Sequence, residues 1–176
     1  RVYEMIASVP TRRDLYQQFL PQGAVGAELG VFEGANAYEL FVLTHPSKLY
    51  LVDPYAFPGA EIAREKATAL MQHTTSIGVE FVCQNDWDWI PTLPKGHLNW
   101  VYLDTRHQRE PTVRELEVLL DHMDPGGLIA GHDFAINPMW GTGVIGPVLD
   151  AVQERRIELL ALSEEFPYPS FIAKVL

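Results

Sequence analysis

Short apolar runs alternate along this chain with longer segments in which apolar residues recur every three or four positions. The short runs predict strands at 24–29, 49–52, 79–82, 98–103, 128–130, 158–162 and 170–175. The longer segments predict helices at 10–20, 35–43, 61–73, 112–122 and 147–155, with a short helix at 87–90. This alternation is typical of β-α-β units on a parallel sheet, and the proline-containing turn before the last run predicts an antiparallel hairpin. We therefore expect an α/β fold: a seven-stranded, mostly parallel sheet with a C-terminal antiparallel β-hairpin and helices on both faces.

The composition is that of an ordinary globular domain, with 176 residues of which 47% are hydrophobic and 20% charged. No repeat or Pro/Gly-rich linker divides the chain, so we expect one domain over 1–176, with 1–20 as an N-terminal helical segment or lid. The apolar runs are too short to span a bilayer and the first residues do not resemble a signal peptide. These features predict a cytoplasmic protein with no membrane partner. The single cysteine, Cys83, excludes a disulfide framework and a multi-cysteine zinc site.

The charge balance is strongly acidic. Lysine and arginine number 13 against 23 aspartate and glutamate residues, which gives a formal net charge of -10. Proteins that bind nucleic acid neutralise phosphates with clustered cations. The balance therefore predicts a partner that is not a nucleic acid.

Polar residues and glycines follow five of the predicted strands, at the edge where open α/β sheets bind ligands. In chain order they are Glu28, Gly30, Phe32 and Gly34, then Asp53, then Asn85 and Asp86, then Asp104 and His107, and last His132 and Asp133. We expect the functional site at this edge.

The turn after the first strand does not fit the common phosphate-binding loops. Gly30 and Gly34 are four positions apart, Phe32 stands where a dinucleotide-binding loop needs glycine, and Glu33 would repel an anion. A cationic or neutral ligand group suits this turn. Asp53 follows the turn by about the number of residues that separates the glycine turn from the ribose-binding acid in dinucleotide-binding folds. The alternative is that the glycines only permit a tight strand-to-helix turn. The other strand-end residues favour a ligand.

Four segments in this order, AELGVFEGANA, LYLVDPY, YLDTRH and PGGLIAGHDF, resemble the class I S-adenosylmethionine-dependent methyltransferases. The closest likeness is to small bacterial members grouped with the macrolide-sugar O-methyltransferases. The resemblance runs from about Thr11 to the C-terminus and implies a single Rossmann-like methyltransferase domain.

The resemblance implies a cofactor role for the residues of the first three strand ends. Glu28, Gly30, Phe32 and Gly34 would line the methionine end of S-adenosylmethionine, Asp53 would hold the ribose, and Asn85 with Asp86 would lie along the adenine. The family often has Gly-Asp-Ser where this chain has Gln84-Asn85-Asp86. Asn85 and Asp86 are also typical of a simple helix N-cap.

The last two strand ends carry the expected chemistry. Carboxylates are ligands that Mg²⁺ prefers, so we expect Asp104 and Asp133 as metal ligands, with His132 as a nitrogen ligand where relatives carry an acid. Asp104 and His107 are the predicted catalytic residues, with His107 as general base toward a hydroxyl. The simpler alternatives are a hydrogen-bonded loop histidine and an aspartate that caps a turn.

The leading hypothesis is a methyltransferase that uses S-adenosylmethionine, with Mg²⁺ assistance, to methylate a sugar, polyketide or phenol hydroxyl. The chain lacks the Asn/Asp-Pro-Pro-Tyr segment of exocyclic-amine methyltransferases and the Pro-Cys nucleophile of cytosine C5 enzymes. Two alternatives stay open: a cofactor-binding regulatory or scaffold protein without turnover, and a metal-dependent hydrolase. The loop at 134–146, which carries Trp140, is the expected substrate lid, and the sequence leaves a homo-oligomer open.

Overall fold

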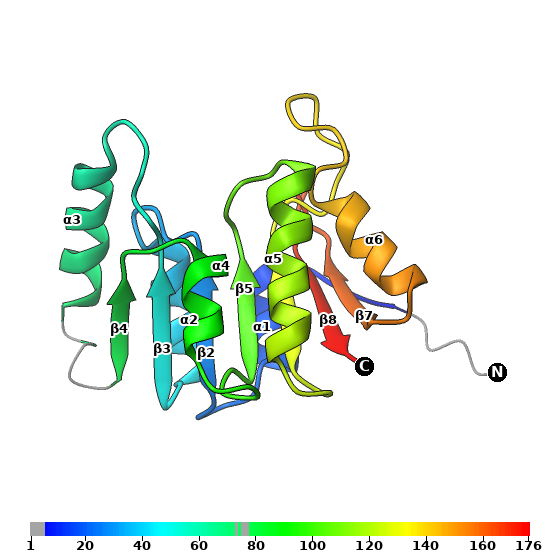
Figure 1. The fold of residues 1–176 in the computed structure, drawn as a ribbon, viewed down its shortest axis with the longest axis horizontal. Helices are drawn as coiled ribbons and strands as arrows, with labels where there is room; N and C mark the ends of the chain where they lie inside the picture. The colour runs from blue at the N-terminus through cyan, green and yellow to red at the C-terminus, as the bar shows by residue number, and fades with distance from the viewer. Residues whose placement is uncertain (1–5, 73, 75–77) are drawn as a thin grey trace.

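The computed structural model describes residues 6–72, 74 and 78–176, and they form a single sheet covered by helices on both faces (Figure 1). The strands are β1 (Ala7–Val9), β2 (Val25–Leu29), β3 (Lys48–Val52), β4 (Val79–Val82), β5 (Trp100–Leu103), β6 (Leu128–Gly131), β7 (Ile157–Ser163) and β8 (Phe171–Val175). The helices are α1 (Arg12–Phe19), α2 (Ala35–Thr44), α3 (Ala60–Met71), α4 (Asp86–Trp89), α5 (Arg109–His122) and α6 (Ile145–Gln153), with a 3₁₀ turn η2 (Ile90–Thr92).

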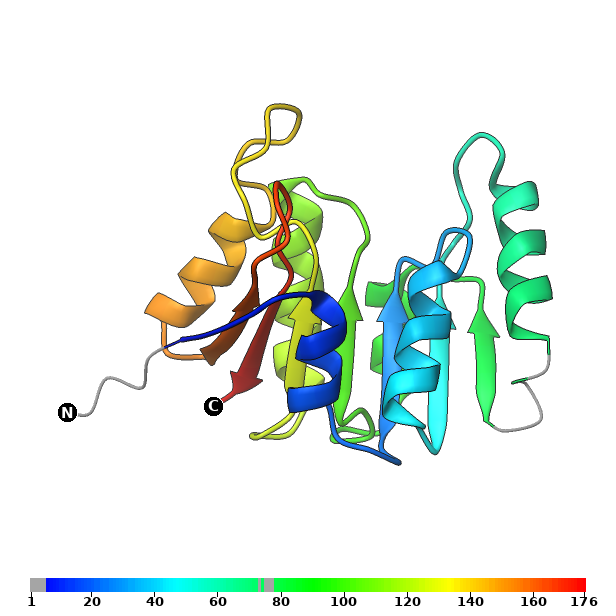
Figure 2. The same cartoon turned by 180° about the vertical axis from the view of Figure 1, so that it is seen from behind.

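Two apolar layers hold the helices to the sheet. Helices α1, α2 and α3 cover one face, which Figure 2 shows toward the viewer, and α4, α5 and α6 cover the other. The first layer packs around Tyr16, Leu40 and Trp100, and the second around Leu119 and Phe171, all of which are fully buried. The sheet is thus buried on both faces, as expected where β-α-β crossovers place helices on both sides.

The strand order is β1-β7-β8-β6-β5-β2-β3-β4. Strands β2 to β6 run parallel, and β8 lies antiparallel between β6 and β7. From β2 the chain moves outward through β3 and β4 before it returns to β5 on the other side of β2. Ligand sites of open α/β sheets lie where the strand order reverses in this way, so the topology points to the space beyond β2 and β5.

The predicted fold class is confirmed, and the seven predicted strands are present. An eighth strand, β1, was missed, because it has three residues and pairs in parallel with 161–163 of β7, so no local pattern marks it. Helices α5 and α6 begin at Arg109 and Ile145, earlier than predicted. The N–H groups of a helix's first turn have no partner within the helix, so a proline is tolerated there. Pro111 and Pro147 therefore lie inside the first turns and do not mark where the helices begin. The predicted end of the third helix at His73 lies outside the described residues. In the described ranges, no helix is both long and apolar enough to cross a membrane.

Candidate functional site

A cavity of about 670 Å³ opens at the carboxyl edge of the sheet, beyond the ends of β2, β3, β4 and β5. All seven predicted cofactor residues line it: Glu28, Gly30, Phe32, Gly34, Asp53, Asn85 and Asp86. The two predicted catalytic residues, Asp104 and His107, line the same cavity. The structure therefore brings these nine residues together, and their individual roles stay predictions.

The glycine turn after β2 is fixed by two close approaches. Gly30 has a φ of 86°, and a Cβ at this position would lie 2.0 Å from the carbonyl oxygen of Asp104 at the end of β5. Asp53, at the end of β3, accepts hydrogen bonds at Oδ2 from the backbone N–H groups of Val31 and Phe32, each at 3.0 Å. Its carboxylate therefore holds the turn against the next strand, in addition to any contact with a ligand.

Glu28 is a buried acid on the cavity wall. It is 1% exposed, and its Oε1 accepts a hydrogen bond of 2.8 Å from Nδ2 of Asn36 in the first turn of α2. Its Oε2 has no hydrogen-bond partner among the described residues. Burial raises the pKa of Glu28 well above its usual value. Buried polar atoms without a hydrogen-bond partner are rare in folded proteins, so Oε2 of Glu28 is an available contact for a ligand in the cavity.

Two further acids, Asp86 and Glu115, line the part of the cavity formed by α4 and α5. Glu115, on α5, accepts a 2.5 Å hydrogen bond from the hydroxyl of Thr105, and burial together with the nearby Asp86 raises its pKa to about 8. Asp86 is 5% exposed, its pKa is also raised by burial, and its Oδ2 lacks a hydrogen-bond donor in the described part of the chain. Asn85 occupies the N-cap position of α4 without a side-chain capping bond. This part of the cavity thus combines buried carboxyl groups with a free acceptor.

Two tryptophans of α4 have different surroundings, as expected for residues two apart. Trp89 is buried in the core, 4.9 Å from the ring of Tyr50. Trp87 lines the cavity instead, and the guanidinium groups of Arg106 and Arg114 lie over its ring at 5.1 and 4.6 Å. The flat Trp87 ring is therefore part of the cavity wall and carries two exposed cations at its border.

The carboxylates after β5 and β6 meet at one imidazole. Nε2 of His107 lies 2.8 Å from Oδ2 of Asp133 and 3.2 Å from Oδ1 of Asp104. Burial opposes the charged ring, but the two carboxylates outweigh this effect and raise the pKa of His107 to about 9. The two histidines beside Asp133 hold its pKa well below the usual value in spite of burial. The metal-free cluster is therefore an imidazolium between two carboxylates near neutral pH.

The structure places the predicted metal ligands differently from the expectation. Ligand atoms of Asp104, His107 and Asp133 lie within 4.8 Å of one another, whereas His132 is not part of this converging set in the described chain. Nδ1 of His132 lies 3.3 Å from Oδ2 of Asp133. Neighbouring residues at a strand end point to different sides, and the left-handed backbone of Asp133, with a φ of 56°, turns its carboxylate toward His107.

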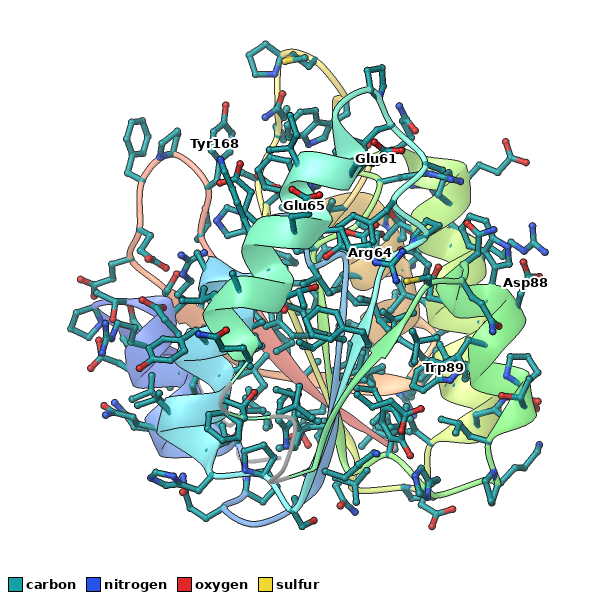
Figure 3. All side chains as sticks on the ribbon, turned by 90° about the vertical axis from the view of Figure 1, so that its left-hand side faces the viewer. Glu61, Arg64, Glu65, Asp88, Trp89 and Tyr168 are labelled. Atoms are coloured by element: carbon teal, nitrogen blue, oxygen red, sulfur yellow. The ribbon has the colours of Figure 1, made fainter. Side chains whose placement is uncertain are left out.

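The 134–146 loop projects beyond β5 and α5 in Figure 1. The Trp140 ring stacks on the His107 ring with centroids 4.6 Å apart, and Tyr168 lies 6.3 Å farther along. Gly143 lets the backbone of the loop pack closely against that of His107, because a Cβ there would lie 1.9 Å from the carbonyl oxygen of His107. In Figure 3, Tyr168 lies at the same end of the molecule as Glu61 at the start of α3. The predicted lid loop is therefore in contact with the predicted base.

Several cavity residues were missed by the sequence reading. They are Arg12 of α1, Asn36 of α2 and Glu115 of α5, together with Phe57 of the loop after β3. A signal existed for Glu115, since it shares the buried face of α5 with Leu116 and Leu119, where an acid is unexpected.

Solved structures of similar fold cover nearly the whole chain. A proposed methyltransferase from Streptococcus mutans, SMU.1697c in complex with SAH (S-adenosylhomocysteine), has a TM-score of 0.67 at 15% identity and covers 94% of this chain and 96% of its own. A proposed rRNA methylase from Clostridium thermocellum has a TM-score of 0.70 at 12% identity and covers 94% and 95%. An rRNA methylase from Streptococcus thermophilus has a TM-score of 0.66 at 15% identity and covers 94% of each chain. No curated protein sequence matches this chain.

The prediction that the partner is not a nucleic acid is wrong, and these neighbours correct it. Two of them, with the same fold over nearly the same length, are described as rRNA methylases. A net charge of -10 sums over the whole surface and says nothing of where the cations lie. Here Arg106 and Arg114 lie together over Trp87 beside the cavity, so overall acidity does not exclude an RNA substrate.

The sequence itself matches a known family. A family model described as a methyltransferase domain matches residues 27–134, which is more than half of the 176 residues and includes all of the strand ends described above. The fold agrees, and one structural neighbour is solved with SAH, the product that methyl transfer leaves from S-adenosylmethionine. The chain therefore belongs to the methyltransferase-domain family, and it is a class I, S-adenosylmethionine-dependent methyltransferase.

Proposed function

We propose that the protein transfers the methyl group of S-adenosylmethionine to a hydroxyl oxygen, with His107 as the base and a small molecule such as a sugar, polyketide or phenol as the acceptor. The observation that carries the proposal is the position of His107, on the cavity wall, between two carboxylates and under the ring of Trp140. A base held next to the cofactor cavity suits an acceptor whose proton must leave as the methyl group arrives.

The step balances as an in-line displacement. The acceptor oxygen forms a bond to the methyl carbon, the bond from that carbon to sulfur breaks, and its electron pair stays on sulfur to leave S-adenosylhomocysteine. The hydroxyl proton passes to Nε2 of His107, where Asp104 and Asp133 stabilise the resulting imidazolium. Proximity and orientation supply much of the rate enhancement in such a transfer.

The protonation state of His107 sets the expected pH dependence. With a pKa of about 9 in the metal-free protein, most of the ring is charged at neutral pH and cannot accept a proton. Turnover by this route should therefore rise with pH up to about 9.

Two of the same residues fit a divalent cation. Ligand atoms of Asp104 and Asp133 lie within 4.8 Å of each other, and two carboxylates are a plausible donor set for Mg²⁺, which would leave His107 unbound as the base. When bound, such a cation would lower the pKa of an acceptor hydroxyl. It would also compete with the imidazolium for Asp104 and Asp133, so that His107 would titrate at lower pH.

We place the methyl acceptor beside Trp140. This ring and Tyr168 form an aromatic wall next to His107, and planar rings or sugar faces pack well against aromatic side chains. A flat or cyclic small molecule would thereby present its hydroxyl toward Nε2 of His107.

The test is a methyl-transfer assay with methyl-labelled S-adenosylmethionine and four acceptor classes: free sugars and glycosides, polyketide lactones, phenols, and ribosomal RNA. We expect label on an oxygen of a small acceptor, and saturable binding of S-adenosylhomocysteine with or without EDTA. His107→Asn should lower turnover about 100-fold or more, as expected for loss of a general base, with cofactor affinity nearly unchanged.

His45→Asn is the matched control, because His45 is an exposed residue after α2, at the opposite edge of the sheet. It should leave turnover as in the wild type. Label on nitrogen or carbon, label on RNA alone, or full turnover in His107→Asn would each overturn the proposal.

A further inference from the structure

The loop at 134–146 carries two buried hydrogen-bond donors that have no acceptor. Asn137 is 3% exposed, and within the described ranges neither its Nδ2 nor Nε1 of Trp140 has a hydrogen-bond partner. A buried donor without an acceptor costs stability and is rare in folded proteins. Here two such donors lie three positions apart, in the loop whose tryptophan stacks on the proposed base.

Neither donor is used to shape the loop. The backbone N–H and carbonyl groups of Asn137 and Gly141 pair with each other at 2.8 and 2.7 Å, and Oδ1 of Asn137 accepts a hydrogen bond of 2.7 Å from the N–H of Met139. This last contact fixes the orientation of the amide, so that its amino group is the part left without a partner. The carbonyl oxygen of Trp140 accepts a hydrogen bond of 3.1 Å from the N–H of Gly143. The loop therefore closes through its backbone and one amide oxygen, and both side-chain N–H groups remain available.

The indole N–H belongs to the ring beside the proposed base. The Trp140 and His107 rings are stacked, with centroids 4.6 Å apart and planes 25° apart, so the edges of the two rings lie side by side. A molecule that presents a hydroxyl to Nε2 of His107 would bring its neighbouring atoms to the indole edge. The tip of the loop is open to solvent, since Ile136 and Met139 are 76% and 85% exposed. A segment with so little packing at its tip can shift to admit a ligand to the two donors.

The charges around the loop indicate which kind of group these donors suit. The amide and indole N–H groups are neutral. The imidazolium of His107 is already engaged by Asp104 and Asp133, at 3.2 and 2.8 Å from Nε2. The ring of His132 lies against Asp133 as well, at 3.3 Å. Neither histidine is therefore free to balance an anionic ligand, and the matching group is an uncharged hydroxyl, ether or carbonyl oxygen.

We propose that Asn137 and Trp140 determine acceptor specificity, by donating hydrogen bonds to uncharged oxygens of the acceptor other than the one that is methylated. The acceptor is then an oxygen-rich ring such as a glycoside, which carries hydroxyl groups on adjacent carbons and an apolar face that packs on an aromatic ring. A phenol with a single oxygen leaves both donors unpaired. The inference rests on the proposed function, in taking a hydroxyl at His107 as the group that is methylated.

The test uses the methyl glycosides of glucose, galactose and rhamnose, with phenol as the reference that has one oxygen. Each is titrated into ¹⁵N-labelled protein loaded with S-adenosylhomocysteine. The indole N–H signal of Trp140, identified by its absence in Trp140→Phe, should move downfield with a glycoside as the N–H gains an acceptor, and should move less with phenol. Trp100 is an internal control: its Nε1 also lacks a partner in the described chain, but its side chain is fully buried in the core, so its signal should stay in place.

Two variants remove one donor each. Trp140→Phe keeps an aromatic ring beside His107 without the N–H, and Asn137→Asp keeps an oxygen for the N–H of Met139 without the amino group. Each should weaken glycoside binding about tenfold, as expected for loss of one hydrogen bond to a ligand. The affinity for phenol should stay close to that of the wild type, and it reports any loss of stacking. Met139→Leu is the matched control, because Met139 is exposed in the same loop and contacts Asn137 through its backbone.

Thermal unfolding of each variant checks that it is folded. Wild-type affinity for the glycosides in both variants, equal losses for glycosides and phenol, or an unmoved Trp140 signal would each overturn the inference. Binding of phenol alone would do the same. The methyl-transfer assay on the wild type tests the proposed function separately: label on the oxygen of phenol alone would leave O-methylation in place and remove the inference, whereas no label on any small acceptor would remove the proposed function itself.

Discussion

The cluster around His107 allows a prediction with a defined magnitude. In metal-free protein the His107 ring should titrate at about 9, compared with 6.5 for an ordinary histidine. This difference corresponds to about 3 kcal/mol in favour of the charged ring in the folded state. It comes from Asp133 and Asp104, at 2.8 and 3.2 Å from Nε2, acting against burial.

The sign follows from the direction of the shift. Because the pKa is raised in the folded protein, the stabilisation is complete below pH 6.5 and is lost as the pH rises to about 9. His107→Asn should therefore destabilise the protein most at pH 6 and least at pH 10. Asp133→Asn should bring the pKa of His107 back toward its ordinary value, since one of the two carboxylates is gone.

The assay is NMR observation of the imidazole protons in EDTA from pH 5.5 to 10.5, with urea unfolding of wild type and His107→Asn over the same range. His45→Asn, at the opposite edge of the sheet, should show no such pH-dependent difference in stability from the wild type. A His107 pKa at or below 6.5, or one that Asp133→Asn leaves in place, would show that the carboxylates do not hold the ring as described.

Three further predictions concern Gly30, Glu115 and Trp140. Gly30→Ala places a Cβ 2.0 Å from the carbonyl oxygen of Asp104 and should cost about 1–3 kcal/mol of folding free energy, measured by urea unfolding; an unchanged midpoint would contradict the close approach. Burial raises the pKa of Glu115 to about 8, so wild type should lose stability as the pH rises from 4.5 to 8. Glu115→Gln, which needs no proton, should melt higher than wild type at pH 8 and at the same temperature below pH 4.5, and identical melting temperatures at pH 8 would argue against a buried neutral acid. Trp140→Ala removes the ring that stacks on His107 and should raise KM for the acceptor while KM for S-adenosylmethionine stays constant; equal increases in both would exclude a lid specific to the acceptor.

The strand pattern predicted most of the fold, because buried parallel strands are continuous apolar runs that are visible in the sequence. It also located the cavity, since the residue after each parallel strand must lie at one edge of the sheet. β1 was not predictable in this way, because its three residues at 7–9 are stabilised by pairing with β7, more than 150 positions away.

Apart from Glu115, whose place on an apolar helix face was a signal, the contributions of the helices to the site could not be predicted from the sequence. Whether Arg12 or Arg13 faces the cavity depends on how α1 packs on the sheet, and the two residues look alike in the chain. The contact between Asp133 and His107 likewise depends on a left-handed backbone at Asp133. Both are properties of tertiary packing, which local periodicity does not encode.

The most direct test of the account is a crystal structure of the protein with S-adenosylhomocysteine. We expect the ligand to fill the 670 Å³ cavity, with the adenine along Asn85 and Asp86, the ribose at Asp53, and the amino-acid end at Glu28. The sulfur would then face His107 and the loop that carries Trp140. A ligand bound elsewhere, or bound in this cavity with the amino acid at Asp86 and the adenine at Glu28, would contradict it.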